Sequence, residues 1–179
     1  MLEAANENRR LRPSDMDRDA FVETFGGVYE HSPWIAERVH ADGLTSAHDT
    51  VAGLHGALRD AVDAAGAEKQ LDLLMAHPDL AGRLAKQGEL TASSSSEQAS
   101  AGLDQCTPEE YEEFRSLNDR YREKFGFPYI LAVRGMDRQD ILENFRRRVD
   151  NDRETEFAEA LKQVHRIAFL RITSLFEDN

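Results

Sequence analysis

Residues 107–128 read TPEEYEEFRSLNDRYREKFGFP, and this stretch contains the beginning, the apolar face and the end of one amphipathic helix. Residues 107–110 form a capping box with proline at the first helical position. The aromatic and leucine side chains that follow recur at steps of three and four, which places them on one helix face: Tyr111, Phe114, Leu117 and Tyr121. Gly126 and Pro128 then break the helix.

Apolar residues with the same helical period occur on both sides of this stretch. They predict further helices within 17–28, 33–39, 51–62, 71–77, 141–149 and 157–175. The chain shows no alternation of strands with helices and no internal repeat. It therefore predicts an all-α fold, a single-domain helical bundle of about eight to nine helices. Residues 14–179 are expected to form this domain, preceded by a flexible N-terminus over 1–13.

Several helix ends can be assigned to particular residues. Ser32 is the expected N-cap before Pro33. His77 is expected to end its helix because Pro78 disfavours helical geometry in the residue before it. A second capping box is expected over 94–97, and a short helix over residues 80–84 would begin at Asp79.

The charge balance argues against several classes of partner. The chain carries 34 acidic against 22 basic residues, a net charge of −12. Such a surface repels phosphate groups, which argues against nucleic acid and against anionic membranes. No apolar run approaches the roughly 20 residues of a membrane span, and the N-terminus lacks the apolar segment of a secretory signal. Cys106, the one cysteine, suits a reducing compartment, so we expect a cytoplasmic protein.

Motifs for metal, nucleotide and serine chemistry are missing or incomplete. Glu37-x-x-His40 has the spacing of di-iron bundles, but those bundles need the motif twice with two further glutamates, so a solvated helix face explains it. The chain has no glycine-rich phosphate loop and no Gly-x-Ser-x-Gly elbow. The serines over 93–96 fit a polar loop that ends in a helix cap better than a nucleophile. We therefore predict no metal site.

Two side chains stand out by their apolar surroundings. His77 can exchange a proton near neutral pH, or it is simply a helix-terminal histidine favoured by the helix dipole. Arg171 lies between Leu170 and Ile172, so its guanidinium needs an anionic partner, either an Asp or Glu side chain or a ligand. A run of three arginines is expected on a solvated helix face: Arg146, Arg147 and Arg148.

Several segments together resemble the OHCU decarboxylase family, in order and over about residues 17–176. The most specific are His77-Pro-Asp-Leu, Ser94-x-x-Glu-Gln and Lys124-Phe-Gly-Phe-Pro. The remaining segments are 25–37, 101–103, 117–118 and 167–172.

The resemblance implies an all-α homodimer that needs neither a metal nor an organic cofactor. It implies that the catalytic residues are His77, Glu97 and Arg171. It further implies substrate contacts from the proline after the histidine and from the serine and glutamine of the Ser-x-x-Glu-Gln motif. Further contacts come from the backbone of an apolar run that we expect to be extended or a buried loop. These residues are Pro78, Ser94, Gln98, Tyr129, Ile130, Leu131, Ala132 and Val133. Tyr129 stands where phenylalanine is commoner, a change that keeps the ring.

The implied reaction is decarboxylation of 2-oxo-4-hydroxy-4-carboxy-5-ureidoimidazoline (OHCU), a small anion, to (S)-allantoin in urate degradation. The C=N bond of OHCU is a built-in electron sink for the departing carbon dioxide. We hypothesise that His77 is the general acid–base, that Glu97 orients it or binds ureido N–H groups, and that Arg171 binds the anionic oxygens. Backbone amides over 130–132 would donate to ring carbonyls. Two alternatives stay open: a non-enzymatic acidic interaction module, and a decarboxylase of a related ureide acid.

Overall fold

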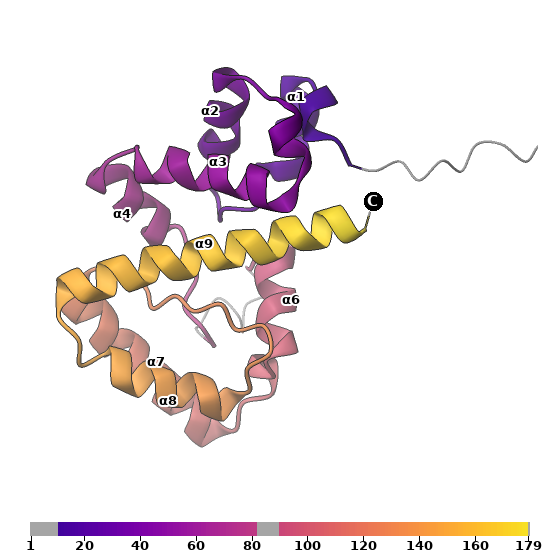
Figure 1. Ribbon diagram of the computed structural model, residues 1–179. Coiled ribbons are helices and arrows are strands. Elements are labelled where there is room, and N and C mark those ends of the chain that lie inside the picture. Colours follow the sequence, from indigo (N-terminus) through magenta and orange to yellow (C-terminus); the bar gives the residue numbers. More distant parts are fainter. Residues whose placement is uncertain (1–10, 82–89, 179) are drawn as a thin grey trace, which may run out of the picture. The chain divides into compact units, whose positions relative to one another are not determined.

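The chain is helical throughout the residues that this computed structural model describes, 11–81 and 90–178 (Figure 1). Eight α-helices and three short 3-10 helices lie in these ranges, which contain no strand. The predicted all-α fold of eight to nine helices is confirmed. The α-helices are α1 (Arg18–Phe25), α2 (Trp34–Asp42), α3 (Val51–Asp63), α4 (Ala67–Met75), α6 (Ala92–Ser100), α7 (Pro108–Phe125), α8 (Arg138–Arg148) and α9 (Arg153–Glu177), and the 3-10 helices are η1 (Pro13–Asp15), η2 (Ser46–Asp49) and η3 (Leu103–Gln105).

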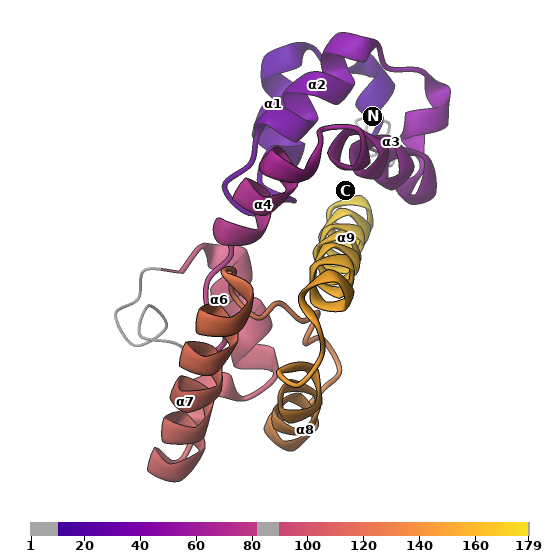
Figure 2. The ribbon, with the colours of Figure 1, turned by 90° about the vertical axis from the view of Figure 1, so that its left-hand side faces the viewer.

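The described residues form two compact units. The first comprises residues 11–66 and 167–178, and the second comprises Ala67–Arg166. Helix α9 belongs to both, because its residues up to Arg166 are part of the second unit and those from Ile167 are part of the first. Figure 2 shows the same helices from the side, with α7 and α8 in the second unit.

The first unit has a core of apolar side chains from α1, α3 and the C-terminal part of α9. The rings of Phe21 and Phe25 are buried on one face of α1, with centroids 5.1 Å apart. The Phe25 ring also lies 6.4 Å from that of Phe176. The predicted stripe of α3 is buried at Leu54, Leu58 and Val62.

The second unit is built around an aromatic cluster between α7, α8 and the segment that joins them. Tyr121 of α7 packs edge-on against Tyr129 and Phe145, with ring centroids 5.5 and 5.9 Å away. The rings of Tyr129 and Phe145 are stacked at 3.7 Å. Residues 129–133 are buried and belong to no helix or strand, so the expectation of a buried loop is confirmed.

The capping signals were assigned correctly in one case and wrongly in two. The Thr107 hydroxyl accepts from the Glu110 amide at 3.2 Å and the Glu110 carboxylate from the Thr107 amide at 3.0 Å, as expected. Ser94 is not a cap, because Thr91 offers the same hydroxyl three residues earlier and accepts from the Ser94 amide at 3.2 Å. Ser32 does not cap α2 either, since Pro33 takes that position and the Ser32 hydroxyl donates to the Glu30 carbonyl.

Other expected boundaries lie partly outside the described residues. Residues 1–10 of the expected flexible stretch and most of the short helix expected after Asp79 are not among them. Within the described range, Pro13 is buried in η1, and the Ser14 amide and hydroxyl both donate to the Asp49 carboxylate. Helix α4 ends at Met75, two residues before His77.

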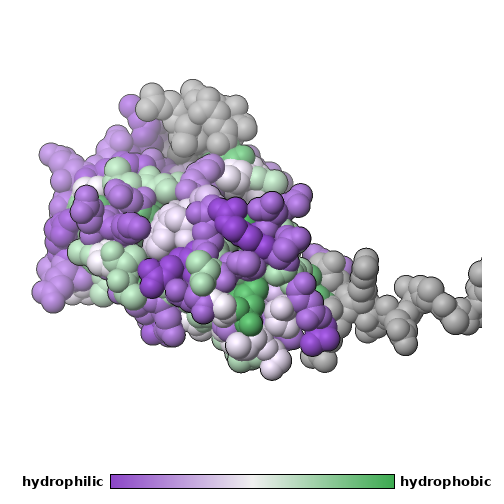
Figure 3. All heavy atoms as spheres, turned by 90° about the horizontal axis from the view of Figure 1, so that it is seen from above, coloured by the Kyte–Doolittle hydropathy of each residue, from purple (hydrophilic) through white to green (hydrophobic). Residues whose placement is uncertain are grey.

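The surface is rich in polar side chains. Seen from above the view of Figure 1, the surface is mostly hydrophilic with scattered hydrophobic areas (Figure 3). None of the helices in the described ranges has the length and apolar character needed to cross a membrane.

The capping box of α7 gives the first prediction. Thr107→Ala removes the hydroxyl that accepts from Glu110, and we expect it to lower the free energy of unfolding by about 1 kcal/mol in urea titrations. Thr107→Ser keeps the hydroxyl and should retain nearly all of the wild-type stability. Equal stability of the Ala and Ser variants would contradict this.

Candidate active site

His77 is a buried histidine whose ring orientation is set by the helix before it. Its exposed fraction is 6%, and Nδ1 lies 2.9 Å from the carbonyl oxygen of Leu73. A carbonyl oxygen only accepts hydrogen bonds, so Nδ1 carries the hydrogen. In the neutral ring, Nε2 then carries the lone pair and is the nitrogen that can take up a proton.

The loop that follows His77 is held through its backbone by side chains from α6 and α7. The Gln98 side-chain oxygen accepts from the Ala81 amide at 3.0 Å, and its nitrogen donates to the Asp79 carbonyl at 3.5 Å. The Asn118 side chain donates to the Leu80 carbonyl at 2.9 Å. Ala81 is held at φ +48°, a left-handed conformation that non-glycine residues rarely adopt. The bonds on either side therefore fix a strained backbone next to His77 and Pro78.

Three of the residues implied by the resemblance lie on one helix, α6. Ser94, Glu97 and Gln98 are spaced three and four residues apart and therefore share a face of α6. Ser94 and Gln98 are buried, and Glu97 is half-buried. Because Gln98 binds the loop after His77, the structure brings this part of α6 next to the segment that carries His77 and Pro78.

A cavity of about 570 Å³ lies beside the same loop. Its wall includes Ala81 and Gln98, together with residues of η3 and of the first turn of α7. Cys106 also lines it, and burial raises the pKa of this thiol. The thiol also donates to the Leu103 carbonyl, which suits a structural residue better than a nucleophile.

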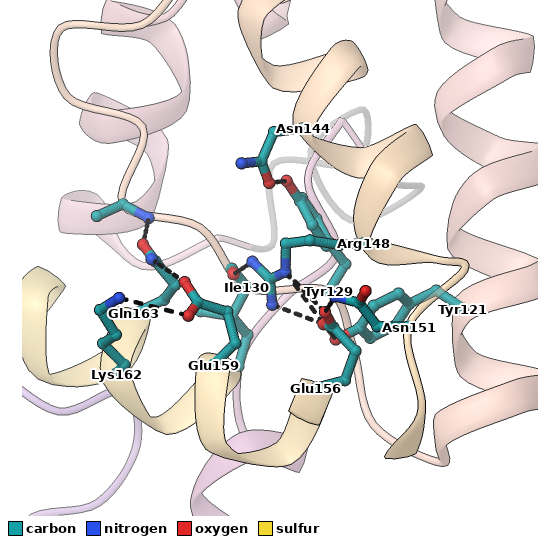
Figure 4. A network of polar contacts seen from close by, with 11 residues as sticks. Tyr121, Tyr129, Ile130, Asn144, Arg148, Asn151, Glu156, Glu159, Lys162 and Gln163 are labelled. Atoms are coloured by element: carbon teal, nitrogen blue, oxygen red, sulfur yellow. Dashed lines mark hydrogen bonds and ion pairs between the residues drawn. The ribbon is translucent and has the colours of Figure 1, made fainter. Parts of the chain in front are cut away.

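The segment over 129–133 is fixed by three side chains, as Figure 4 shows. The Tyr129 hydroxyl donates to the Asn144 side chain at 2.6 Å. Arg148 Nη1 donates to the Ile130 carbonyl at 2.7 Å, and the Ala132 amide donates to the side-chain oxygen of Gln163 at 3.1 Å. The Ala132 amide, expected as a substrate donor, thus already has a partner in the chain.

Arg148 corrects the prediction that all three consecutive arginines face solvent. Arg146 and Arg147 are exposed, but Arg148 is only 3% exposed and Glu156, its partner, is fully buried. Arg148 Nη2 and Nε lie 2.9 and 3.0 Å from one Glu156 oxygen (Figure 4). The Tyr121 hydroxyl donates to the same oxygen, and Asn151 to the other at 2.8 Å. Arg146 pairs with Glu113 at the surface, whereas the pair of Arg148 with Glu156 is buried on the apolar side of α8.

The ionisation of this buried network follows from its contacts. Burial is the largest influence on the pKa of Arg148 and would lower it, but the hydrogen bonds to Glu156, together with the electrostatic effects of Tyr121, Glu156 and Tyr129, raise the pKa. Burial, and after it the hydrogen bond to Glu156, raises the pKa of the Tyr121 phenol. Burial also raises the pKa of Tyr129. The arginine is therefore charged and both phenols are neutral at physiological pH.

Arg171 lies in the first unit and has the acidic partner that its apolar surroundings require. Its Nη1 is 2.9 Å from a carboxylate oxygen of Glu30, and their side chains are 7% and 1% exposed. The residue after Glu30, His31, has φ +47°. Of the two non-glycine residues with positive φ in the described ranges, Ala81 lies in the loop after His77 and His31 follows the partner of Arg171.

No group of three or more potential metal ligands lies together among the residues that the structure describes. Glu37, part of the incomplete metal motif, is bound by Arg18 at 3.0 Å. The His40 ring packs 5.7 Å from that of Phe21.

The sequence interpretation missed Asn118, Arg148, Glu156 and Gln163. A signal was available for Asn118 and Arg148, because each stands on a helix face whose neighbouring positions are apolar. Asn118, for example, is four residues after Phe114 and three before Tyr121. As with Arg171, a polar side chain on an apolar helix face needs a polar partner. Gln163 lies on a half-buried face, and its sequence gives no comparable signal.

Comparisons with known proteins agree with this architecture. A family model described as OHCU decarboxylase matches residues 14–173, nearly the whole chain. The chain belongs to the OHCU decarboxylase family.

Similar members of the family occur in distant organisms. The 2-oxo-4-hydroxy-4-carboxy-5-ureidoimidazoline decarboxylase of Haloferax volcanii is 47% identical over 90% of this chain and 92% of its own length. The enzyme of the same name from Mus musculus is 38% identical over 92% of this chain and 91% of its own. A uric acid degradation bifunctional protein of Bacillus subtilis is 39% identical, and there the match covers 32% of the relative.

Solved structures show the same fold. A crystal structure of (S)-allantoin synthase superimposes with a TM-score of 0.74 at 34% identity, and this chain matches 52% of it, about half its length. A crystal structure of OHCU decarboxylase in the presence of (S)-allantoin gives a TM-score of 0.66 at 21% identity, a similarity of fold. The predictions of this family and of a carboxy-lyase are confirmed by the matches, and the non-enzymatic alternative is set aside.

The buried ion pair gives a prediction for stability. Arg148→Ala leaves the Glu156 carboxylate buried without its cation, and we expect it to lower the free energy of unfolding by about 3–5 kcal/mol. Arg147→Ala, at the exposed neighbouring position of the same helix, is the matched control and should change it by less than about 0.5 kcal/mol. Urea unfolding followed by far-ultraviolet circular dichroism measures both, and similar values for the two variants would refute the role.

Proposed function

We propose that this chain decarboxylates OHCU to (S)-allantoin, with His77 as the general acid–base. The observation that carries the proposal is a buried histidine whose Nδ1 is fixed on the Leu73 carbonyl, at the start of a loop held by Gln98 and Asn118. Family membership supports the same reaction. A fixed ring at the edge of a rigid loop suits proton transfer to a defined position.

The reaction needs protons to be added and removed at defined substrate atoms, and it needs the substrate ring to be held in one orientation. When the bond from the ring to the carboxylate breaks, its electron pair moves toward the neighbouring C=N bond, and the ring nitrogen takes up a proton. The hydroxyl then loses its proton as its oxygen becomes a carbonyl, and the adjacent carbon takes up a proton on one face. In sum, the substrate anion and one proton give carbon dioxide and allantoin. A protein that holds the ring in one orientation makes a single enantiomer.

The arrangement of His77 suits the proton-transfer steps. Its Nε2 takes the proton of the substrate hydroxyl, and the same nitrogen can return it on one side of the ring. The Leu73 carbonyl keeps Nδ1 protonated, which holds the ring orientation and the tautomer. Glu97, three residues from Ser94 on the same face of α6, orients the histidine or accepts from the ureido N–H groups.

Arg171 is proposed to bind the anionic oxygens of the substrate. Its guanidinium carries five N–H donors in a planar arrangement, and Nη1 is the nitrogen that binds Glu30. Glu30 therefore orients the plane of the guanidinium. Charge-assisted hydrogen bonds of this kind are stronger than neutral ones in a buried site.

The family resemblance also supports a homodimer in the cytoplasm, with this small anion as the ligand. These points stay predictions. A light-scattering mass equal to one chain would overturn the dimer. The alternative substrate, a related ureide acid, is tested by offering several such acids beside OHCU and comparing kcat/KM. A higher kcat/KM for another ureide acid would make that acid the substrate, while the reaction would still be a decarboxylation.

Loss of the histidine gives the central functional prediction. We expect His77→Ala to lower the rate of enantioselective decarboxylation by about 10²–10⁴-fold while the protein stays folded. OHCU is made in situ from urate with urate oxidase and hydroxyisourate hydrolase, and circular dichroism follows the (S)-allantoin signal. Near-normal formation of this signal by the folded variant would exclude His77 as the acid–base.

Arg171→Lys keeps the positive charge beside Glu30 but loses the planar set of donors. We expect kcat/KM for OHCU to fall by about 10–100-fold, the equivalent of one or two charge-assisted hydrogen bonds. Arg166→Lys, at an exposed position of the same helix, is the matched control and should retain wild-type constants. Unchanged kinetics in Arg171→Lys would show that this arginine serves only the ion pair with Glu30.

A further inference from the structure

We propose that Gln163 and Arg148 are positioning residues for the substrate, which act by holding the backbone of Ile130 and Ala132 so that the peptide N–H of Leu131 faces the ligand. The inference rests on the proposed function, because it concerns how the same site binds OHCU. Neither side chain is implied by the resemblance as a site residue.

Side chains of α8 and α9 bind the backbone of the segment over 129–133. Arg148 Nη1 of α8 donates to the Ile130 carbonyl, as Figure 4 shows. The Ala132 amide donates to the side-chain oxygen of Gln163 of α9. Ile130 and Ala132 are alternate residues of a segment that is neither helix nor strand. The Ile130 carbonyl and the Leu131 N–H belong to one trans peptide group and therefore point in opposite directions. The bond from Arg148 thus directs the N–H of Leu131 away from Arg148, and the bond to Gln163 fixes the next peptide group.

Arg148 and Gln163 are themselves fixed by hydrogen bonds to acidic side chains. Arg148 is locked by three contacts of 2.9–3.2 Å with the Glu156 carboxylate. The Gln163 nitrogen donates to Glu159 at 2.7 Å, which fixes its side-chain amide with the oxygen toward Ala132. A donor fixed in this way needs no reorganisation when a ring carbonyl binds to it.

The conformation of residues 129–133 depends on the bonds with Arg148 and Gln163. Residues 129–133 make no helical or strand hydrogen bonds that would fix their peptide planes. Loss of the bond at Ala132 lets the neighbouring peptide planes rotate, so the N–H of Leu131 no longer points in one direction. The consequence is weaker binding of substrate and transition state alike, which raises KM and leaves kcat nearly unchanged.

The test uses the full-length protein and variants of Gln163, which is only half-buried. Gln163→Met keeps the side-chain length but cannot accept from Ala132, and we expect KM for OHCU to rise about three- to tenfold, the equivalent of one hydrogen bond. The double exchange Gln163→Glu with Glu159→Gln restores an acceptor toward Ala132 and a donor toward that acceptor. It should return KM to the wild-type value.

Two controls separate positioning from a general effect on folding. Lys162→Met changes the neighbouring, 75% exposed side chain, which contacts Glu159 but not the loop, and should leave KM unchanged. A merely structural role of Gln163 would lower the active fraction, and hence kcat, with KM intact. That pattern would overturn the proposal, as would a KM in the double exchange as high as in Gln163→Met.

The wild-type protein tests the proposed function separately. If it does not accelerate formation of (S)-allantoin from OHCU, the proposed function fails before any variant is measured. If wild type is active and Gln163→Met has the wild-type KM, the function stands and this inference fails. Arg148→Lys, which keeps a cation beside Glu156 but loses the geometry toward Ile130, provides a second folded variant in which KM should rise.

Discussion

The buried ion pair of Arg148 and Glu156 is the interaction on which the second unit depends most. Removing two charges from water is costly, and their attraction offsets that cost only when further hydrogen bonds complete the geometry. Here Tyr121, Asn151 and the Ile130 carbonyl supply them. These partners come from α7, from the turn before α9 and from the segment before α8. One ion pair thus fixes the helices and the loop relative to one another within this unit.

The two loops that carry expected site residues are both held by hydrogen bonds from helix side chains to their backbone. Neither the segment after His77 nor residues 129–133 can satisfy its own backbone groups by regular structure. Side chains from rigid helices bind those groups instead, Gln98 and Asn118 in the first loop and Arg148 and Gln163 in the second. Irregular backbone can then present peptide donors and a histidine at fixed positions, which helices alone cannot do.

The sequence predicted what depends on periodicity and missed what depends on long-range partners. The apolar stripes of α3 and α7 and the Thr107 cap follow from residues within a few turns, and they are confirmed. Two caps were wrong because Thr91 and Pro33 compete for the position within three residues of the expected serines. Arg148 was placed in solvent although it shares a helix face with Ile141 and Phe145, because its partner Glu156 lies on another helix and no local pattern identifies that glutamate.

The pairing of Arg171 with Glu30 bears on catalysis as well as on folding. Decarboxylation turns a carboxylate into neutral carbon dioxide and moves the electron pair toward the ring, so a site with excess positive charge at the carboxylate would stabilise the substrate more than the transition state. Glu30, 2.9 Å from Arg171 and almost fully buried, balances that charge. On the proposed function, Arg171 then binds the substrate through directed N–H donors, and little of its full charge opposes the loss of the carboxylate.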